Sequence, residues 1–295
     1  MGGLARCHLV LQLMSSKYTF LGAMRPFSLV VAIATCGLGI SLALIDHGED
    51  GWLAWLVLTA GLLLQIAVNL INDYPDLENA TLDLATQRSI RRNAKIGWAV
   101  MLLAVAIGLY MVSIRGYPLL LLGLVGVAGA WGYTGGKVNY KQRGLGIILV
   151  FLLMGVLLIG GSYYVLTGRY TMEVFWLSLP FSLLSSLLLL SNELRDFESD
   201  RDAGIRTLIV RIGYDSGVRL YYLLVSLVYL ICALLFWSGM LPGLLMLLVT
   251  SVALIGPISQ LKSSPGQRIK LTSLTGRFYL LFGATYLATL WSGLP

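Results

Sequence analysis

The chain has 295 residues, of which 57% are hydrophobic and only 12% charged, and its formal net charge is +7. Soluble domains usually carry about a quarter of their residues as charged side chains, so this composition excludes an ordinary soluble enzyme. The basic residues lie between long apolar stretches, a placement that indicates membrane orientation and argues against a nucleic-acid partner.

Apolar windows recur along the whole chain, and crossing a hydrocarbon core takes roughly 20 such residues. The sequence predicts an all-α polytopic membrane protein of about nine transmembrane helices, near 27–45, 52–71, 96–114, 117–132, 145–167, 172–191, 218–238, 240–258 and 276–293. These windows use most of the length. We therefore expect a single transmembrane domain over residues 25–295, preceded by an N-terminal extension over residues 1–24.

The basic residues flank these predicted helices unevenly. With nine helices, all but two of the 21 Lys and Arg residues fall on one side of the membrane, the exceptions being Arg115 and Arg169. Loops rich in Lys and Arg stay in the cytoplasm. We therefore expect the N-terminus and the long loops on the cytoplasmic side of the cell membrane, with membrane lipid around the helices.

Two acidic segments follow predicted helices on that cytoplasmic side. Asn72 and Asp76 follow the second helix, and Asn192, Asp196 and Asp200 follow the sixth. In both segments an Asn precedes an Asp by four residues, which places the side chains on one helical face. Stacked carboxylates need cations, and Mg²⁺ is commonly held by one or two carboxylates plus phosphate oxygens. The pair predicts a magnesium diphosphate site, the alternative being two solvated, charged helix ends.

Basic side chains on the same side are candidates for phosphate binding. Lys137 lies in the glycine-containing loop after the fourth helix, and Arg25 stands just before the first helix. The simpler alternatives are a cytoplasmic charge on a turn for Lys137 and an interfacial anchor for Arg25. Pro75 lacks a backbone donor, so it predicts a helix break within the first acidic segment.

Taken together, these residues resemble the UbiA-type superfamily of intramembrane prenyltransferases. Asn72-Asp73-Tyr74-x-Asp76 is similar to its first motif, and Asn192-x-x-Arg195-Asp196-x-Glu198-x-Asp200 is similar to its second. Three further stretches are most similar to the 1,4-dihydroxy-2-naphthoate branch of the family, which serves menaquinone synthesis: Arg25-Pro26, Tyr133-Thr134-Gly135-Gly136 and Arg143-Gly144-Leu145-Gly146.

The resemblance implies a Mg²⁺-dependent transferase that moves a polyprenyl group from an allylic prenyl diphosphate to an aromatic acceptor. It assigns metal binding to Asn72, Asp73, Asp76, Asn192, Asp196 and Asp200, and diphosphate binding to Arg25, Tyr133, Lys137, Arg143 and Arg195. The residues expected to carry the chemistry are Asp76, Lys137, Asp196 and Asp200.

Three departures from the family pattern leave alternatives open. Ala80 stands where many members have a third Asp, so Glu78 or Asp83 is the candidate replacement. The Gly-Pro-x-Arg stretch of the naphthoate branch is absent, and Lys137 follows Tyr133 by four residues, as in the 4-hydroxybenzoate branch. The favoured acceptor is 1,4-dihydroxy-2-naphthoate, and the alternatives are 4-hydroxybenzoate, homogentisate or another lipid precursor. An ion-coupled transporter and a non-catalytic scaffold are the alternatives of other classes.

Overall fold

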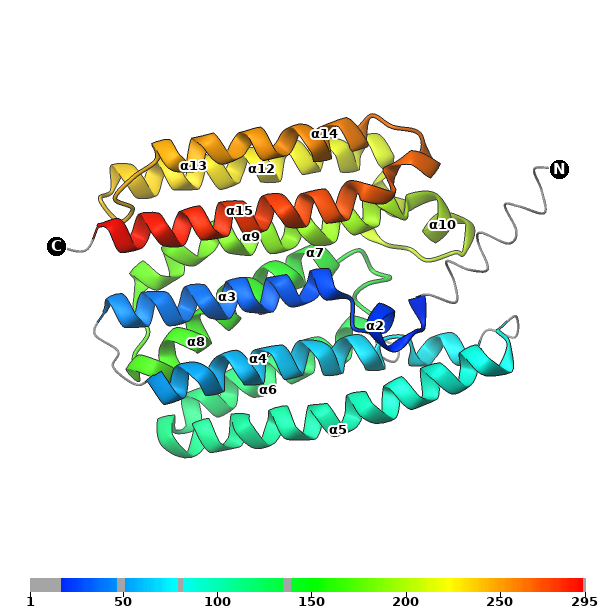
Figure 1. Ribbon diagram of the computed structural model, residues 1–295, viewed down its shortest axis with the longest axis horizontal. Coiled ribbons are helices and arrows are strands. Elements are labelled where there is room, and N and C mark those ends of the chain that lie inside the picture. Colours follow the sequence, from blue (N-terminus) through cyan, green and yellow to red (C-terminus); the bar gives the residue numbers. More distant parts are fainter. Residues whose placement is uncertain (1–16, 47–50, 79–81, 135–138, 294–295) are drawn as a thin grey trace.

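The computed structural model is a bundle of long helices that run side by side (Figure 1), described for residues 17–46, 51–78, 82–134 and 139–293. No strand occurs in these ranges. The first half contains α2 (Phe20–Ala23), α3 (Pro26–Ile45), α4 (Gly51–Ile71), the 3-10 helix η1 (Tyr74–Glu78), α5 (Leu84–Arg115), α6 (Tyr117–Thr134) and α7 (Gly146–Leu149). The second half contains the π-helix η2 (Val150–Leu157), α8 (Leu158–Thr167), α9 (Met172–Arg195), α10 (Phe197–Asp202), α11 (Leu208–Ile212), α12 (Tyr214–Trp237), α13 (Leu245–Val249), η3 (Thr250–Leu254), α14 (Ile255–Leu261), η4 (Pro265–Lys270) and α15 (Leu271–Ser292).

Six helical segments of the described residues are long and apolar enough to cross a membrane: Ser28–Ile45, Gly51–Leu77, Leu84–Arg115, Gly146–Thr167, Met172–Arg195 and Tyr214–Trp237. The three other predicted windows fall on shorter apolar helices, Tyr117–Tyr133 and Leu245–Leu261, and on α15. The all-helical membrane fold is confirmed. The count of nine spans is not confirmed and stays a prediction.

Helix α9 is the central helix of the bundle and packs against α3, α12, α15 and η2. Its buried serines direct their hydroxyls to nearby acceptors; for example, Ser182 donates to the Ser178 carbonyl oxygen and Ser186 to the Ile147 carbonyl oxygen. A Cβ at Gly155 would lie 2.3 Å from the Ser182 hydroxyl oxygen. Small residues at this contact allow η2 to approach α9 closely, as in other membrane bundles.

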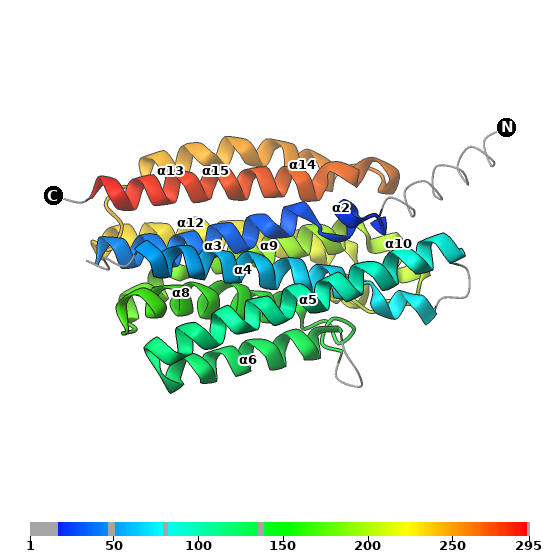
Figure 2. The same cartoon turned by 60° about the horizontal axis from the view of Figure 1, so that its bottom comes forward.

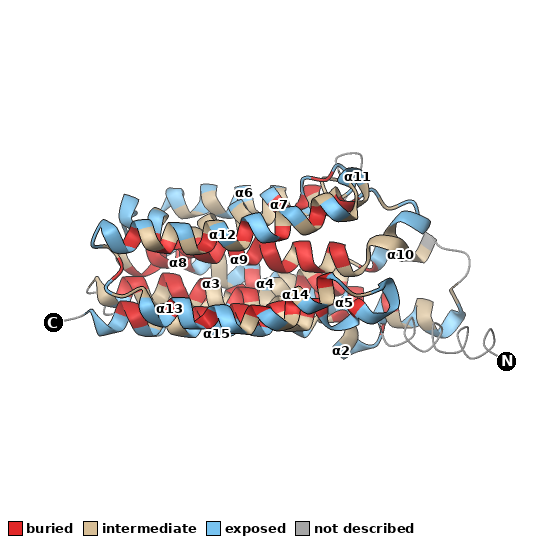
Figure 3. Ribbon diagram, turned by 90° about the horizontal axis from the view of Figure 1, so that it is seen from above, coloured by how far each residue is buried: buried red, intermediate tan, exposed pale blue. Residues whose placement is uncertain are grey.

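The outer faces of the bundle expose large apolar side chains, while the buried residues concentrate inside (Figure 3). Trp52, Trp55, Leu245 and Trp237 are each more than 60% exposed. Soluble proteins rarely expose large contiguous apolar patches, and a lipid environment removes the cost. Figure 2 shows α5 and α6 along one edge of the bundle and α13, α14 and α15 along the other.

Helix α5 begins twelve residues before its predicted window, at Leu84 instead of 96. The additional turns are polar and contain Arg88, Arg91 and Arg92, so hydropathy alone did not detect them. Asp83 starts the helix, because its side chain accepts a hydrogen bond from the Thr86 backbone N–H at 3.1 Å. The basic residues after the second span therefore lie on a helix and not in a loop.

Candidate active site

The first acidic segment lies at the helix break that Pro75 predicts. Helix α4 ends at Ile71 and η1 begins at Tyr74, with the Asp76 backbone N–H donating to the Asp73 carbonyl oxygen at 3.1 Å. The break is confirmed. The prediction that Asn72 and Asp76 share one α-helical face is wrong, because α4 ends before Asn72 and Asp76 lies on a separate 3-10 helix. The break leaves the Asp73 side chain buried and the Asp76 side chain partly exposed at the end of the bundle.

Arg25 reaches the buried carboxylate from the start of α3. Its Nη2 donates to Asp73 Oδ1 at 2.6 Å. With the Asn72 side-chain amide oriented so that its oxygen faces Arg25, that oxygen accepts from Arg25 Nη1 at 2.6 Å. Arg25 has φ 49°, a left-handed conformation that is uncommon outside glycine, and it directly precedes Pro26. This strained cap brings the guanidinium onto the first cluster, so Arg25 is more than an interfacial anchor.

Two residues of the predicted N-terminal extension also contact this cluster. Lys17 Nζ lies 2.8 Å from Asp76 Oδ2 and 4.0 Å from Asp73 Oδ1, and the Tyr18 hydroxyl donates to Asp76 Oδ2 at 2.9 Å. Burial lowers the pKa of Lys17, but the hydrogen bond and charge of Asp76 outweigh it and raise the pKa above its ordinary value. Sequence reasoning missed both residues, since neither belongs to a motif.

The second acidic segment joins α9 to α10. Asp196 ends α9 and begins α10, while its backbone N–H donates to Asn192 O at 2.9 Å and its carbonyl accepts from Asp200 N at 2.8 Å. The backbone hydrogen bonds thus keep a four-residue spacing through the junction, and a common face for the three side chains stays a prediction. Arg195 Nε and Nη2 bind the two oxygens of Asp196 at 2.7 and 2.6 Å, a bidentate pair.

The two clusters lie at the same end of the bundle, the end that carries α2 and α10 in Figure 1. Burial raises the pKa of the Asp200 carboxyl and Asp196 adds to this, whereas the positive charges of Lys141, Arg195 and Lys17 oppose it. Lys17, which binds Asp76 of the first cluster, therefore also acts on Asp200 of the second. The fold thus places at one end of the bundle two acidic segments that are 120 residues apart in the sequence.

A buried ion pair anchors the second cluster. Arg268, only 2% exposed, donates to Glu198 Oε1 at 2.5 Å and to the Leu194 carbonyl oxygen at 3.0 Å, and it lies 4.2 Å from the Tyr214 ring centroid. Glu198, a residue of the second motif, thus fastens α10 to η4. The sequence shows Arg268 only as another cytoplasmic charge, because its partner is 70 residues away.

The glycine-containing loop is described only in part. Lys137, the expected catalytic and diphosphate-binding lysine, lies outside the described residues, as do Gly135 and Gly136. Tyr133 ends the preceding span and lies against Gly146, close enough to Arg25 to interact with its charge. Lys141, which the motifs did not single out, lies in the described part of this loop, and its positive charge lowers the pKa of Asp200.

The remaining predicted residues occupy the edge of the site. Arg143 is exposed on the loop before α7. Asp83 is exposed and caps α5, and the hydrogen bonds from Thr86 hold the pKa of Asp83 below its usual range. The side chain of Glu78 lies outside the described residues. Of the two candidates for the third acid, Asp83 thus has a structural role of its own.

The first cluster fits a magnesium ion on one specific observation. Asp73 Oδ2 is buried and has no hydrogen-bond partner among the residues that the structure describes. A carboxylate oxygen left so is costly unless a cation or donor reaches it. Within the described ranges no three acidic, His or Cys side chains assemble into a metal site. Each of the two clusters offers two carboxylates, and this number suits Mg²⁺, which takes its other ligands from water and phosphate.

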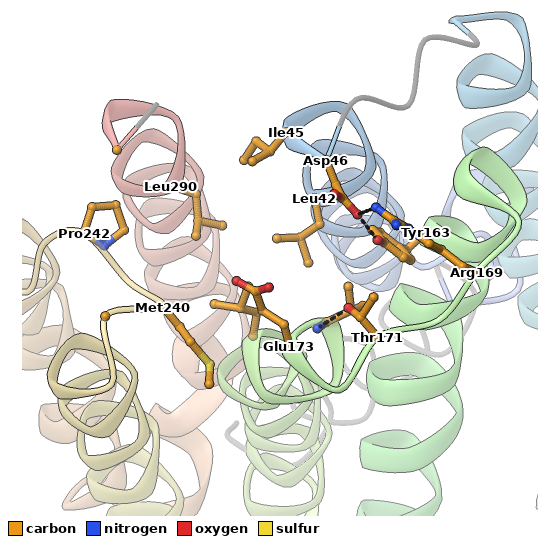
Figure 4. A pocket seen from close by; sticks show the side chains of 14 residues that line it. Leu42, Ile45, Asp46, Tyr163, Arg169, Thr171, Glu173, Met240, Pro242 and Leu290 are labelled. Atoms are coloured by element: carbon orange, nitrogen blue, oxygen red, sulfur yellow. Dashed lines mark hydrogen bonds and ion pairs between the residues drawn. The ribbon is translucent and has the colours of Figure 1, made fainter. Parts of the chain in front are cut away.

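A pocket of about 490 Å³ lies at the opposite end of the bundle (Figure 4). Asp46 there accepts hydrogen bonds from Arg169 at 2.6 Å and from the Tyr163 hydroxyl, and the Glu173 carboxylate points into the pocket. Leu42 and Leu290 form part of its apolar wall. None of the motif residues lines this pocket, so it is not the candidate active site.

Comparison with known proteins identifies the family of the chain. Residues 26–287 match the UbiA prenyltransferase family. The chain belongs to this family. Its relatives include the 1,4-dihydroxy-2-naphthoate octaprenyltransferase of Mycobacterium tuberculosis, 33% identical over 225 residues that cover 71% of this chain and 74% of that protein. The human UbiA prenyltransferase domain-containing protein 1 is 29% identical over 275 residues, 88% of this chain and 81% of that protein.

Solved structures of the family share the fold. A UbiA homologue from Aeropyrum pernix K1 superposes with a TM-score of 0.67 at 16% identity, covering 88% of this chain and 97% of that one. A homologue from Archaeoglobus fulgidus, solved with GPP and Mg²⁺, gives a TM-score of 0.63 at 16% identity, covering 92% and 99%. At this identity the likeness establishes the UbiA fold of the bundle.

Proposed function

We propose that this member of the UbiA family transfers a polyprenyl group from an allylic prenyl diphosphate to 1,4-dihydroxy-2-naphthoate, a step of menaquinone synthesis. The observation that carries the proposal is the pair of acidic clusters at one end of the bundle, where the buried Asp73 Oδ2 has no hydrogen-bond partner among the described residues. The names of the bacterial relatives support the choice of acceptor.

The two clusters are the proposed binding site for Mg²⁺ and diphosphate. Asp73 and Asp76 would hold the ion on one side, and Asp196 and Asp200 on the other, with Asn72 and Asn192 as oxygen donors at the first position of each motif. Bound Mg²⁺ supplies Lewis-acid stabilisation of the negative charge that develops on the leaving diphosphate.

The basic residues of the chain bind the diphosphate and stabilise its developing charge. Arg25, Lys141 and Arg195 supply fixed positive charges at the boundary of a low-dielectric bundle, where each acts more strongly than in water. The allylic C–O bond breaks and its electron pair leaves with the diphosphate. The apolar helices exclude water, so the allylic cation survives until the acceptor attacks.

The acceptor then forms the new bond. The ring carbon that bears the carboxylate attacks the allylic carbon, the bond to the carboxylate breaks, and CO₂ leaves while its electron pair restores the aromatic ring. The proposed reaction releases one CO₂ per diphosphate. With 4-hydroxybenzoate, the alternative that the Tyr133 to Lys137 spacing favours, a ring proton leaves in its place and no CO₂ forms.

The distribution of buried charge argues against a transporter. Among the described residues, the fully buried charged side chains are Asp73, Glu193 and Arg268, and all three lie at the end that carries the motifs. Transport routes place polar groups near the membrane midplane. We further propose that this end faces the cytoplasm, because nearly all the basic residues flank it.

A reconstituted assay tests the proposal. The purified protein is supplied with Mg²⁺, a panel of prenyl diphosphates, and either carboxyl-labelled 1,4-dihydroxy-2-naphthoate or 4-hydroxybenzoate. We expect equal amounts of diphosphate and labelled CO₂ from the naphthoate, and little product from 4-hydroxybenzoate. Prenylation of 4-hydroxybenzoate without CO₂ release would contradict the proposed acceptor. Absence of diphosphate release with every acceptor would contradict the proposed prenyltransferase activity.

A further inference from the structure

The segment before α3 makes the most direct contact with the first acidic cluster, yet it lies outside the region that matches the family, residues 26–287. Lys17 Nζ and the Tyr18 hydroxyl both contact the same oxygen, Asp76 Oδ2, at 2.8 and 2.9 Å. Lys17 Nζ also lies 4.0 Å from Asp73 Oδ1. One ammonium therefore serves both carboxylates.

The segment that carries Lys17 is anchored to the bundle. The Tyr18 side chain is 5% exposed, and the Asn93 side chain on α5 donates to the Tyr18 carbonyl oxygen at 3.0 Å. Ala23 of α2 is 1% exposed, and α2 packs against α4 and α5. The backbone that carries the Lys17 ammonium is therefore held in place, while the long lysine side chain can still move between partners a few ångströms apart.

Lys17 and Arg25 leave the first cluster without net charge: two carboxylates, Asp73 and Asp76, face two cations. A divalent ion that binds the same carboxylates meets the ammonium at close range, and like charges repel strongly at a low-dielectric boundary. The ammonium must then leave Asp76. A diphosphate bound between the two clusters offers it new oxygen partners, since both clusters lie at the same end of the bundle as Lys17.

We propose that Lys17 is a diphosphate-binding residue that serves as the counter-ion of Asp76 until metal and diphosphate arrive, and that Tyr18 positions it. This inference rests on the proposed function. In the metal-free protein Lys17 neutralises the first cluster and competes with the metal for Asp76. In the loaded site its ammonium binds the diphosphate, so the same side chain opposes metal binding alone and favours binding of the metal diphosphate.

These opposite effects define the test. Lys17→Gln and the control Lys95→Gln are prepared in lipid nanodiscs; Lys95 is exposed on α5 at the same end of the bundle. Binding of Mn²⁺ alone is followed by electron paramagnetic resonance, and binding of pyrophosphate with Mg²⁺ by calorimetry. We expect Lys17→Gln to bind Mn²⁺ about tenfold more tightly and pyrophosphate about tenfold more weakly, the size of one charge-assisted hydrogen bond. Lys95→Gln should match the wild type.

A second pair of variants shows whether the effects of Lys17→Gln arise from the lost charge or from misfolding. Tyr18→Phe keeps the buried ring and removes the hydroxyl that contacts both Lys17 and Asp76. It should therefore shift both affinities in the same directions as Lys17→Gln, but by less. Lys17→Arg should retain both wild-type affinities within a few fold. Unchanged affinities in Lys17→Gln, or a change of the same sign in both, would overturn the inference. A wild-type protein that binds neither probe would instead overturn the proposed function.

Discussion

Replacing Arg268 by Met should destabilise the protein and impair the site, although Arg268 is not among the proposed metal or diphosphate ligands. The Arg268 side chain is buried, pairs with Glu198 at 2.5 Å, donates to the Leu194 carbonyl oxygen at 3.0 Å and lies over the Tyr214 ring. Met keeps an unbranched apolar stem but lacks the guanidinium group, so the change removes the charge, the donors and the contact with the Tyr214 ring. Glu198 and the carbonyl then lose a partner.

Removing one member of a buried ion pair costs about 3–5 kcal/mol, because the other charge is left uncompensated. The Glu198 side chain is 31% exposed and stays partly hydrated, which reduces the loss. Arg268 Nε has no partner among the described residues, so its removal also relieves a cost that the wild type bears. We therefore expect a loss of about 2–3 kcal/mol, and a fall in the thermal midpoint of about 5–10 °C.

Thermal unfolding of the purified protein in detergent measures the effect, with Arg277→Met as the control because Arg277 is exposed on α15. A double-mutant cycle with Glu198→Gln should give a coupling of about 1–2 kcal/mol. Prenyl transfer by Arg268→Met should also fall, since Glu198 and Asp200 share the short helix α10. If Arg268→Met is as stable as Arg277→Met, or the coupling is zero, the anchoring role is wrong.

Three further predictions follow from the site and its surroundings. Asp76→Asn and Asp200→Asn should each abolish prenyl transfer while expression is retained; near-normal turnover of both variants in Mg²⁺ would contradict the diphosphate site. Asp83→Ala should keep its activity and lower the thermal midpoint slightly, whereas loss of activity would make Asp83 the third acid. Since hydrogen bonds lower the pKa of Asp83, its contribution to stability should be present above about pH 3.9 and lost as the pH falls. Cysteines at positions 206 and 169, replacing two exposed arginines, should react with an impermeant reagent from opposite sides, position 169 from outside; labelling of position 206 in intact cells would reverse the topology.

Much of the site could be predicted because its signals are local in the sequence. The Asn192 to Asp196 spacing matches the helical repeat at the end of α9, and the break at Pro75 follows from a missing donor. Arg25 was a candidate because it stands at the start of a span. The number of spans was harder, since α15 and the shorter apolar helices lie near the limits of length and hydropathy that define a crossing segment.

The contacts that complete the site join residues far apart in the chain. Lys17 and Asp76 are 59 residues apart, and Arg268 and Glu198 are 70 apart. No periodicity connects such residues, and each basic side chain has many possible acidic partners in the sequence.

By itself, the sequence determined that the chain is a helical membrane protein with two matched acidic segments, because hydropathy and helical spacing depend only on neighbouring residues. Only the tertiary structure decided which cations neutralise those acids. It made Lys17 a partner of Asp76 and Arg268 a buried anchor of Glu198, since the packing of α2, α4, α10 and η4 sets the distances between their side chains.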